Sequence, residues 1–250
     1  MRKDADAQSL KQAASTRLTP ILMDLTDVAA VARAAQTVAD AVGDAGIAGL
    51  VNNAGVGTFG PMEALPLDDL RHQLEANVVG QVAVIQAFLP MLRKARGRII
   101  NIGSVGGRTT IPFGGALCAS KHAIEAINDA FRMELRPWGI AVCLVAPGAI
   151  RTTASEKMVD DGERIIARAM PDRMNLYLNP FLKMLREMMR DELAGSSPTV
   201  VAEVIAKALT DPKPQTRYPA GARSTMLSVL PQILPTRLFD WIKLRQVGLV

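Results

Sequence analysis

A short apolar run in the middle of the chain, Ile99 to Ile102, is followed by Gly103-Ser104 and then by a helical pattern that carries Lys121. The run is β-branched and too short for a helix, so it predicts a strand buried on both faces of a parallel sheet. From Ala116 to Leu135 apolar residues recur at helical spacing. Because open α/β sheets bind ligands outside the carboxyl ends of their strands, this strand, loop and helix mark a candidate site.

Strands and helices alternate through the rest of the chain. The pattern predicts further strands at residues 17–23, 47–51 and 140–145, and helices at residues 4–13, 28–42, 67–95, 116–136 and 198–209. We expect Asp27 to cap the helix that starts at Val28, and Pro90 to distort the last part of the long helix. Such alternation is typical of a parallel sheet with helices on both faces, so the predicted class is an α/β doubly wound fold.

Residues 1–221 are expected to form a single domain. Within it, residues 153–195 contain six methionines among other apolar side chains, which suits an adaptable lid over a hydrophobic substrate. An amphipathic helical hairpin that packs on its own body is the alternative. Residues 222–250 are expected to form an amphipathic tail that docks on protein, with a membrane surface as the alternative.

Composition limits the possible functions. The chain has 250 residues, of which 49% are hydrophobic and 21% charged, as in one ordinary globular domain. Its net charge of +5 comes from scattered Lys and Arg, and aromatic residues make up only 4%, so we expect no nucleic-acid binding. Cys118 and Cys143 lack metal-ligand spacing, and there is no signal-peptide pattern, so we expect a reduced, cytoplasmic protein without a metal.

The stretch Gly55-Val-Gly57-Thr-Phe-Gly60 matches a dinucleotide-binding glycine pattern by letter. Pro61 and Met62 follow it where a helix should begin, and the next helix is expected only near Asp68. Without a helix amino terminus to hold a pyrophosphate, we reject this stretch as a phosphate loop.

The positions of Ser104, Leu117 and Lys121 resemble the signature of the short-chain dehydrogenase/reductase family. That family has a serine, a tyrosine thirteen residues later and a lysine four residues further, and Leu117 stands at the tyrosine position. The resemblance implies that Ser104 orients the reacting oxygen and that Lys121 binds the nicotinamide ribose. Leucine cannot move a proton, and losing a general acid/base typically costs on the order of 10²- to 10⁴-fold in rate. Cys118 and His122 are roughly 100° round the helix from the signature positions, so we expect them to point elsewhere.

Further motifs support this resemblance. Asn52-Asn53-Ala54-Gly55 and Pro147-Gly148 each follow an expected strand, although both are also ordinary turn sequences. Asn77 stands where family members keep an asparagine that orders a relay water, and a polar helix residue without a role is the alternative. Arg217 to Gly221 resembles the family's last short strand. The cofactor contacts that the resemblance implies come from Asp24, Asn52, Ala54, Gly55, Lys121, Pro147, Gly148, Ile150 and Thr152.

A complete family member opens with a strand, a Thr-Gly-x-x-x-Gly-x-Gly turn, a helix and a second strand, which this sequence lacks. We therefore expect a Rossmann-like fold that is short by about one βαβ unit of roughly 30 residues at its amino terminus. The pyrophosphate and the ribose lose their usual anchors, so we expect the binding of NAD or NADP to be weak or absent. The strand at 47–51 becomes an unpaired edge, unless residues 17–23 pair with it, another chain covers it, or the true start lies upstream.

The motifs Gly60-Pro-Met-Glu and Arg136-Pro-Trp-Gly-Ile140 resemble those of one branch of the family. That branch acts on apolar alcohols and ketones such as retinoids or steroids. We expect an NAD(P)-dependent oxidoreductase for such a substrate that is impaired or inactive in this form. The competing hypothesis is a non-catalytic partner of an active homologue, because family members commonly pair through the helices equivalent to 67–95 and 116–136. A decayed gene product is a third possibility, and the choice between NAD and NADP stays open.

Overall fold

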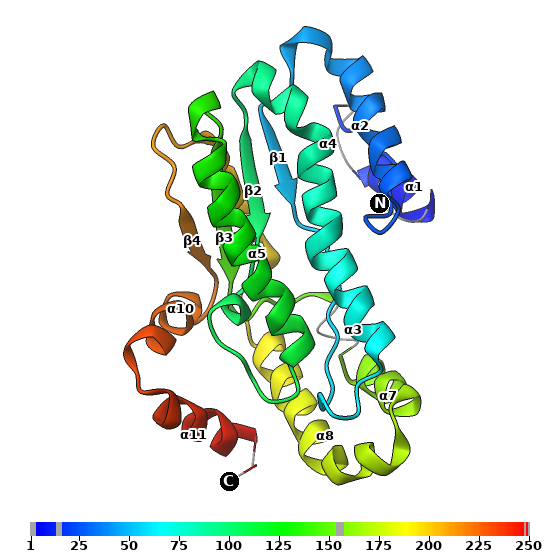
Figure 1. The fold of residues 1–250 in the computed structure, drawn as a ribbon, viewed down its shortest axis with the longest axis vertical. Coiled ribbons are helices and arrows are strands. Elements are labelled where there is room, and N and C mark those ends of the chain that lie inside the picture. Colours follow the sequence, from blue (N-terminus) through cyan, green and yellow to red (C-terminus); the bar gives the residue numbers. More distant parts are fainter. Residues whose placement is uncertain (1–3, 14–16, 154–157, 248, 250) are drawn as a thin grey trace.

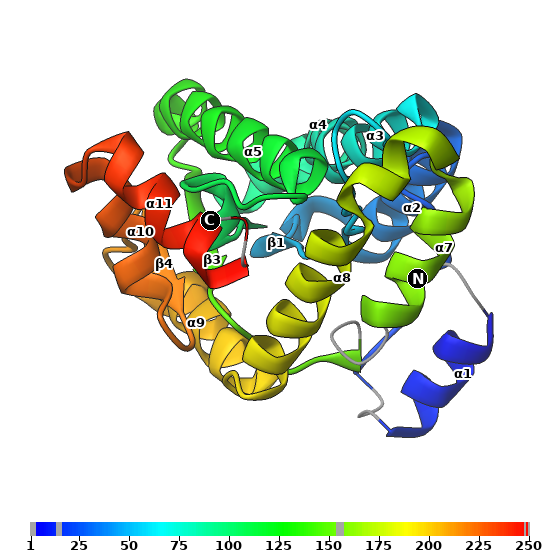
Figure 2. The same cartoon turned by 90° about the horizontal axis from the view of Figure 1, so that it is seen from below.

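The computed structural model of the chain describes residues 4–13, 17–153, 158–247 and 249. In this described part, four parallel strands form one sheet in the order β1-β2-β3-β4. They are β1 (Gly49–Asn52), β2 (Arg98–Ile102), β3 (Ala141–Pro147) and β4 (Arg217–Ala220). Helices α4 (Gly80–Ala95) and α5 (Gly115–Glu134) cover one face of the sheet (Figure 1). Helix α9 (Pro198–Thr210) covers the other face (Figure 2). The predicted α/β class with a parallel sheet and helices on both faces is confirmed.

The central strands β2 and β3 are buried on both faces, as the apolar run predicted. The register pairs Ile99 with Val142 and Ile100 with Cys143. Because side chains alternate across a strand, Ile99 and Val142 pack with residues of α4 and α5, whereas Ile100 and Cys143 pack with residues of α9. Two apolar layers therefore hold the strand that leads to Ser104.

The described residues before β1 include two helices but no strand. Helices α1 (Asp4–Ala13) and α2 (Val28–Val42) form where they were expected, and the Asp27 carboxylate caps α2 by accepting a hydrogen bond from the Ala30 amide at 3.0 Å. Residues 17–23 have no sheet pairing, so the strand predicted there was wrong. Met23 and Leu25 pack instead against the apolar faces of α2 and α4.

Strand β1 lies at the edge of the sheet. It pairs with β2, from Gly49 opposite Arg98 to Asn52 opposite Asn101, and none of the described residues pairs with its outer edge. The side chain of Val51 in this strand is 37% exposed. The edge expected at this position is therefore present, and residues 17–23 do not cover it.

The long helix expected at 67–95 is present, with a change of geometry in the middle. Helix α3 (Leu67–Leu74) continues into a π-helical turn, Glu75–Val79, and then into α4. Pro90 was expected to distort this helix, but it does not interrupt α4, which continues to Ala95. The proline lies on the exposed side of the helix. By length and composition Leu67–Ala95 could also cross a membrane, but 44% of its apolar window is buried inside the fold.

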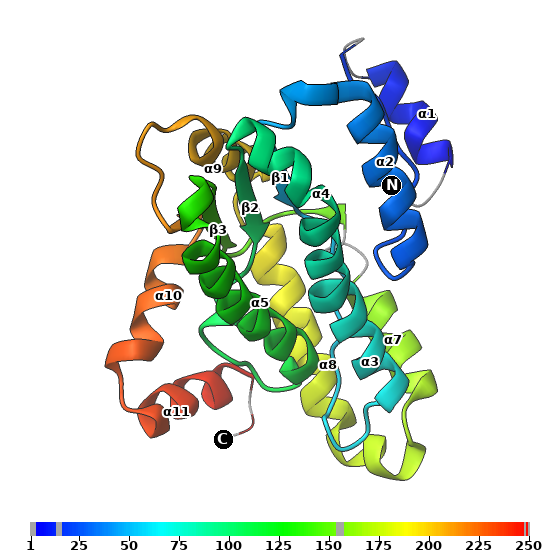
Figure 3. The ribbon, with the colours of Figure 1, turned by 45° about the horizontal axis from the view of Figure 1, so that its top comes forward.

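Helices from the second half of the chain gather below the carboxyl ends of the strands. Helices α7 (Met158–Arg168) and α8 (Pro171–Leu193) form a hairpin, and α10 (Ser224–Ile233) and α11 (Thr236–Val247) form the tail. Seen from below, α8 crosses the molecule opposite α10 and α11 (Figure 2). Helices α1 and α2 lie away from α10 and α11, on the far side of α4 (Figure 3). Short 3-10 turns lie at Gly43–Ala45, Val105–Gly107 and Arg136–Trp138.

Candidate active site

Ser104 lies directly beyond the carboxyl end of β2, where the sequence predicted a site. Its hydroxyl oxygen accepts a hydrogen bond from the Gly106 amide at 3.0 Å and thereby caps the 3-10 turn Val105–Gly107. A Cβ at Gly103 would lie 2.8 Å from the Leu144 side chain, so glycine is needed for the chain to pass β3. The serine is thus fixed by the turn that follows it.

Lys121 lies on α5 and reaches back to the same strand end. Its ammonium donates a hydrogen bond to the Ile102 carbonyl oxygen at 2.9 Å, two residues before Ser104. Burial disfavours the charged form and lowers the pKa of Lys121 from its ordinary 10.5 to about 8. Ser104 and Lys121 therefore both lie at the carboxyl end of β2.

Leu117 lies one helical turn before Lys121, and its side chain lines the same cavity as Ser104. It carries no group that donates or accepts a proton. Cys118 also lines this cavity, so the expectation that it points elsewhere was wrong. Burial raises the pKa of the Cys118 thiol, which keeps it protonated. His122 is exposed, and its Nδ1 lies 2.8 Å from the Cys118 carbonyl oxygen.

Asn77 lies in the π-helical turn, fully buried, and is hydrogen-bonded to the loop after β1. Its Oδ1 accepts from the Val56 amide at 2.8 Å, and its Nδ2 donates to the Val56 carbonyl at 2.9 Å and to the Ser120 hydroxyl at 3.1 Å. Gln73 also donates to the Val56 carbonyl and to Ser120, at 2.8 and 3.2 Å. Ser120 in turn donates to the Leu117 carbonyl at 2.7 Å. This network fixes the start of α5.

Sequence reasoning identified Asn77 but not Gln73 and Ser120. Gln73 precedes Asn77 by four residues on the same helix, a spacing that places both on one face, and this was the available signal. A second amide chain was also missed. It runs from Asn52 Nδ2 to Asn101 Oδ1 and from Asn101 Nδ2 to Asn128 Oδ1, each at 3.0 Å, and joins β1, β2 and α5.

The expected cofactor residues near β1 lie at the open side of the fold. Ala54 and Gly55 are exposed, and the Ala54 carbonyl accepts a hydrogen bond from Gln81 at 3.0 Å. A Cβ on Gly55 would lie 3.1 Å from Asn77 Oδ1, so a larger residue would press on the buried amide. Asn52 is buried in the amide chain rather than exposed to a ligand.

The expected cofactor residues after β3 are only partly brought to the cavity. Gly148 lines it, and a Cβ there would lie 2.1 Å from the Ala222 carbonyl oxygen, so this close approach requires glycine. Pro147 is the last residue of β3. Ile150 is buried in a β-bridge with Ser196, and Thr152 is half-buried without lining the cavity.

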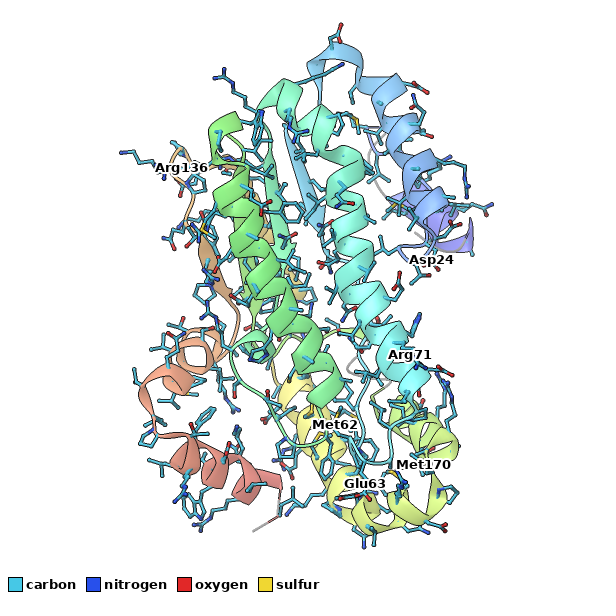
Figure 4. All side chains as sticks on the ribbon, viewed as in Figure 1. Asp24, Met62, Glu63, Arg71, Arg136 and Met170 are labelled. Atoms are coloured by element: carbon cyan, nitrogen blue, oxygen red, sulfur yellow. The ribbon has the colours of Figure 1, made fainter. Side chains whose placement is uncertain are left out.

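Asp24 is far from this cavity. Its carboxylate accepts hydrogen bonds from the amide and the hydroxyl of Thr26, at 2.9 and 2.8 Å, in the turn before α2. Figure 4 shows Asp24 beside α2, whereas Met62 and Glu63 lie at the end of the molecule formed by α7 and α8. In the structure, Asp24 therefore stabilises the turn before α2.

The cavity has a volume of about 620 Å³ and opens at the carboxyl ends of β2 and β3. Apolar side chains from three helices complete its wall: Met184 and Met188 of α8, Leu227 and Leu230 of α10, and Phe239 and Ile242 of α11. The lid predicted at 153–195 therefore contributes through α8. The tail contributes as well, which the sequence did not indicate.

The fold and the pair of Ser104 and Lys121 at the carboxyl end of the sheet are those of a Rossmann-like α/β oxidoreductase. Residues 2–163 match the family model described as short chain dehydrogenase. The chain belongs to the short-chain dehydrogenase/reductase family.

The curated relatives include two retinol dehydrogenases. The chain is 34% identical to retinol dehydrogenase 16 of Mus musculus over 250 residues, which cover 96% of this chain and 78% of that protein. It is 39% identical to retinol dehydrogenase 5 of Homo sapiens over 241 residues, which cover 94% and 75%. By homology the chain is an oxidoreductase of this family.

Solved structures agree on the fold. A short-chain dehydrogenase from Streptomyces avermitilis has a TM-score of 0.73 at 24% identity and covers 98% of this chain and 86% of its own. NAD⁺-bound xylitol dehydrogenase has a TM-score of 0.65 at 26% identity and covers 80% of this chain and 77% of its own.

The described residues fit one half of a nicotinamide dinucleotide. The Lys121 ammonium has three N–H donors, of which the Ile102 carbonyl uses one. The space beside Gly148 is filled by the Ala222 carbonyl and the Ser224 amide of the chain itself. The adenosine half fits less well, because Asp24 is engaged with Thr26 and no strand among the described residues lies beyond β1.

Proposed function

We propose that this chain has the site of a retinol-dehydrogenase-like oxidoreductase for apolar alcohols or ketones, with its proton-transfer step disabled. In this proposal the apolar substrate occupies the cavity between α8 and the α10–α11 pair. Ser104 orients the reacting oxygen and Lys121 binds the nicotinamide ribose, as the family resemblance implies. When bound, the cofactor supplies or accepts the hydride.

The observation that carries the proposal is the leucine in the cavity wall. Oxidation of an alcohol releases a hydride and also a proton, and the proton needs an acceptor within hydrogen-bond reach of the reacting oxygen. Leu117 lines the cavity at the signature position and offers none. Ser104 is held as a turn cap, and burial keeps the Cys118 thiol protonated, so neither neighbour replaces a phenol.

We further propose that the 250-residue chain binds NAD or NADP weakly. The support is the open edge of β1, together with the exposure of Ala54 and Gly55. A dinucleotide held mainly by its nicotinamide half makes fewer contacts than one that rests on a glycine turn and a helix amino terminus. The proposed loss of activity therefore has two separate causes, which are weak cofactor binding and the missing proton-transfer group.

The test compares the wild type with Leu117→Tyr and Leu117→Phe. Retinol oxidation is followed by nicotinamide absorbance at saturating NAD or NADP, and cofactor binding by nicotinamide fluorescence. We expect Leu117→Tyr to gain at least about 100-fold in rate, because it restores a general acid/base beside Lys121. The matched Leu117→Phe variant fills the same space without a hydroxyl and should show no gain.

Two results contradict the proposal. One is a wild type that oxidises retinol as fast as Leu117→Tyr, since leucine then does not limit the rate. The other is a Leu117→Tyr variant that binds cofactor and retinol without gaining activity. Tight cofactor binding by the wild type contradicts only the proposed weak affinity.

A second candidate function is a non-catalytic partner of an active homologue. Its support is the exposed apolar surface near the end of α5, where Met133 is 61% exposed and Trp138 is 49% exposed. A chain that neither turns over nor associates with itself or a homologue would exclude this function.

A further inference from the structure

Helix α11 has two faces, and the fold uses one of them. The residues of this helix that line the cavity recur at helical spacing and so share one side of it: Phe239, Ile242, Lys243 and Gln246. Phe239 is only 8% exposed, and the Lys243 ammonium donates a hydrogen bond to the Thr110 carbonyl at 2.9 Å. The inner face of α11 is therefore held against the loop before α5.

The opposite face of α11 is exposed. Arg237, Trp241 and Arg245 follow one another at intervals of four residues, so they form one row along the helix, and Leu238 lies beside that row. Trp241 is 48% exposed and Leu238 is 46% exposed, and both arginines are exposed as well. In Figure 2, α10 and α11 lie at the margin of the molecule. This outer face of α11, made of Arg237, Leu238, Trp241 and Arg245, is open to a partner.

The preceding helix adds exposed apolar surface to the tail. Helix α10 contains no charged residue, and three apolar side chains at helical spacing are between 49% and 69% exposed: Met226, Val229 and Ile233. Met226 also lines the cavity, so the exposed apolar surface continues to the cavity edge. Exposed apolar patches rimmed by polar residues mark sites of interaction with proteins or membranes.

The free charges of the outer face have one sign. Neither Arg237 nor Arg245 has a carboxylate partner among the described residues, and the Arg245 guanidinium lies 5.2 Å from the centre of the Trp241 ring. Asp240 is the one acidic residue of α11, and it pairs with Lys243 at 2.9 Å. The outer face is therefore cationic, and its complement is an anionic surface.

A lipid surface fits this combination better than a protein does. A protein partner that covers the face must take both guanidinium groups out of water, which is costly unless each meets a carboxylate. At a membrane surface, leucine and tryptophan enter the headgroup region while the arginine heads stay hydrated among the phosphates. Tryptophan is enriched at that depth because its ring is amphipathic.

We propose that the outer face of α11 docks on the surface of a membrane that contains anionic lipids. Leu238 and Trp241 enter the headgroup region, and Arg237 and Arg245 pair with the acidic headgroups. Because the inner face of the same helix is a wall of the cavity, docking places the cavity beside the lipid. This inference goes beyond the proposed function and requires neither cofactor binding nor turnover.

The chain has two tryptophans, which allows each end of the molecule to be followed separately. Trp138→Phe leaves Trp241 as the fluorophore, and Trp241→Phe leaves Trp138, which is 49% exposed in the turn after α5. Each variant is mixed with vesicles of equal parts phosphatidylcholine and phosphatidylserine that carry bromine on the acyl chains as a quencher. We expect the emission of Trp138→Phe to shift to shorter wavelength and to be quenched. The emission of Trp241→Phe should not change.

Vesicle affinity tests the individual side chains. Arg237→Gln and Arg245→Gln should each lose about fivefold, the contribution of one cation near an anionic surface. Leu238→Gln should lose about tenfold, because it no longer buries an apolar side chain. Arg93→Gln is the matched control, since its guanidinium lies 4.9 Å from the Trp138 ring, and it should bind as the wild type does. All four side chains are exposed, so an unchanged Tm separates binding from folding.

Four results overturn the inference. One is no binding to the anionic vesicles, and another is equal affinity for vesicles of phosphatidylcholine alone. The third is quenching of Trp138 in place of Trp241. The fourth is a Trp241 emission that shifts with protein concentration in the absence of lipid, since a second copy of the chain then covers the outer face. The activity of Leu117→Tyr bears only on the proposed function.

Discussion

Among single residues, Lys121 has the most unusual environment. Its ammonium is buried beside Ile102, and burial lowers the pKa of Lys121 to about 8. Between this value and the ordinary 10.5, the unfolded chain holds a proton that the folded protein has released. The contribution of Lys121 to the free energy of unfolding therefore rises with pH across that window.

The first prediction follows from this linkage. At and below pH 8 the buried charge penalises the wild type, so Lys121→Met should have its largest stability advantage there, and the advantage should shrink towards pH 10.5. The raised pKa values of Cys118 and Cys143 act in the opposite direction but are common to both proteins and cancel in the difference. Urea unfolding, followed by circular dichroism at several pH values, measures the difference in stability between Lys121→Met and the wild type. A difference that does not change with pH would contradict the burial of the ammonium.

Among the elements, the junction between the π-helical turn and α4 depends on a glycine. A Cβ at Gly80 would lie 2.6 Å from the Leu25 carbonyl oxygen and 2.9 Å from the Leu25 side chain. The close contact lets residues before α2 lie on α4, where Met23 and Leu25 join the core cluster of Val31 and Phe88. The glycine therefore allows this segment to pack on α4.

The second prediction concerns Gly80→Ala. In an exposed helix this change would stabilise by about 1 kcal/mol. Here we expect a loss of about 1–3 kcal/mol, because the methyl group must displace backbone. Urea unfolding of the variant measures this loss. Gly57→Ala is the control, since its Cβ would meet only the Phe59 ring at 3.5 Å, and it should change stability little. A Gly80→Ala variant that is more stable than the wild type would show that the contact with Leu25 is dispensable.

For the whole molecule, we expect the open edge of β1 to be the surface through which the chain associates. An edge strand with unpaired backbone groups and an exposed apolar residue, here Val51, is a template for pairing with another chain. Met133 at the end of α5 is another exposed apolar residue. Each surface can be removed by one charged side chain.

The third prediction uses this pair of surfaces. We expect the chain to associate with itself in sedimentation velocity at rising concentration, and Val51→Lys to reduce this association, because a lysine on an edge opposes pairing. Met133→Lys should leave it unchanged. If Met133→Lys dissociates the assembly and Val51→Lys does not, the α5 surface is the interface, as the non-catalytic partner function requires.

The residue patterns determined the α/β class, the places of α1, α2, α5, α9 and the long helix α3–α4, and the position of Ser104 at the end of a buried strand. These follow from local rules: β-branched runs form buried strands, and helical spacing places residues four apart on one face. Asp27 as a helix cap was predictable for the same reason. The leucine at position 117 follows directly from the spacing between Ser104 and Lys121.

Only the tertiary structure decided the rest. Residues 17–23 read as a strand but have no edge to pair with, since pairing depends on distant neighbours and not on local pattern. The amide network of Gln73, Asn77 and Ser120 joins segments far apart in the chain, and so does the hydrogen bond from Lys243 to the Thr110 carbonyl. Hydrogen-bond partners and burial arise only when such segments pack together, so no spacing along the sequence reveals them.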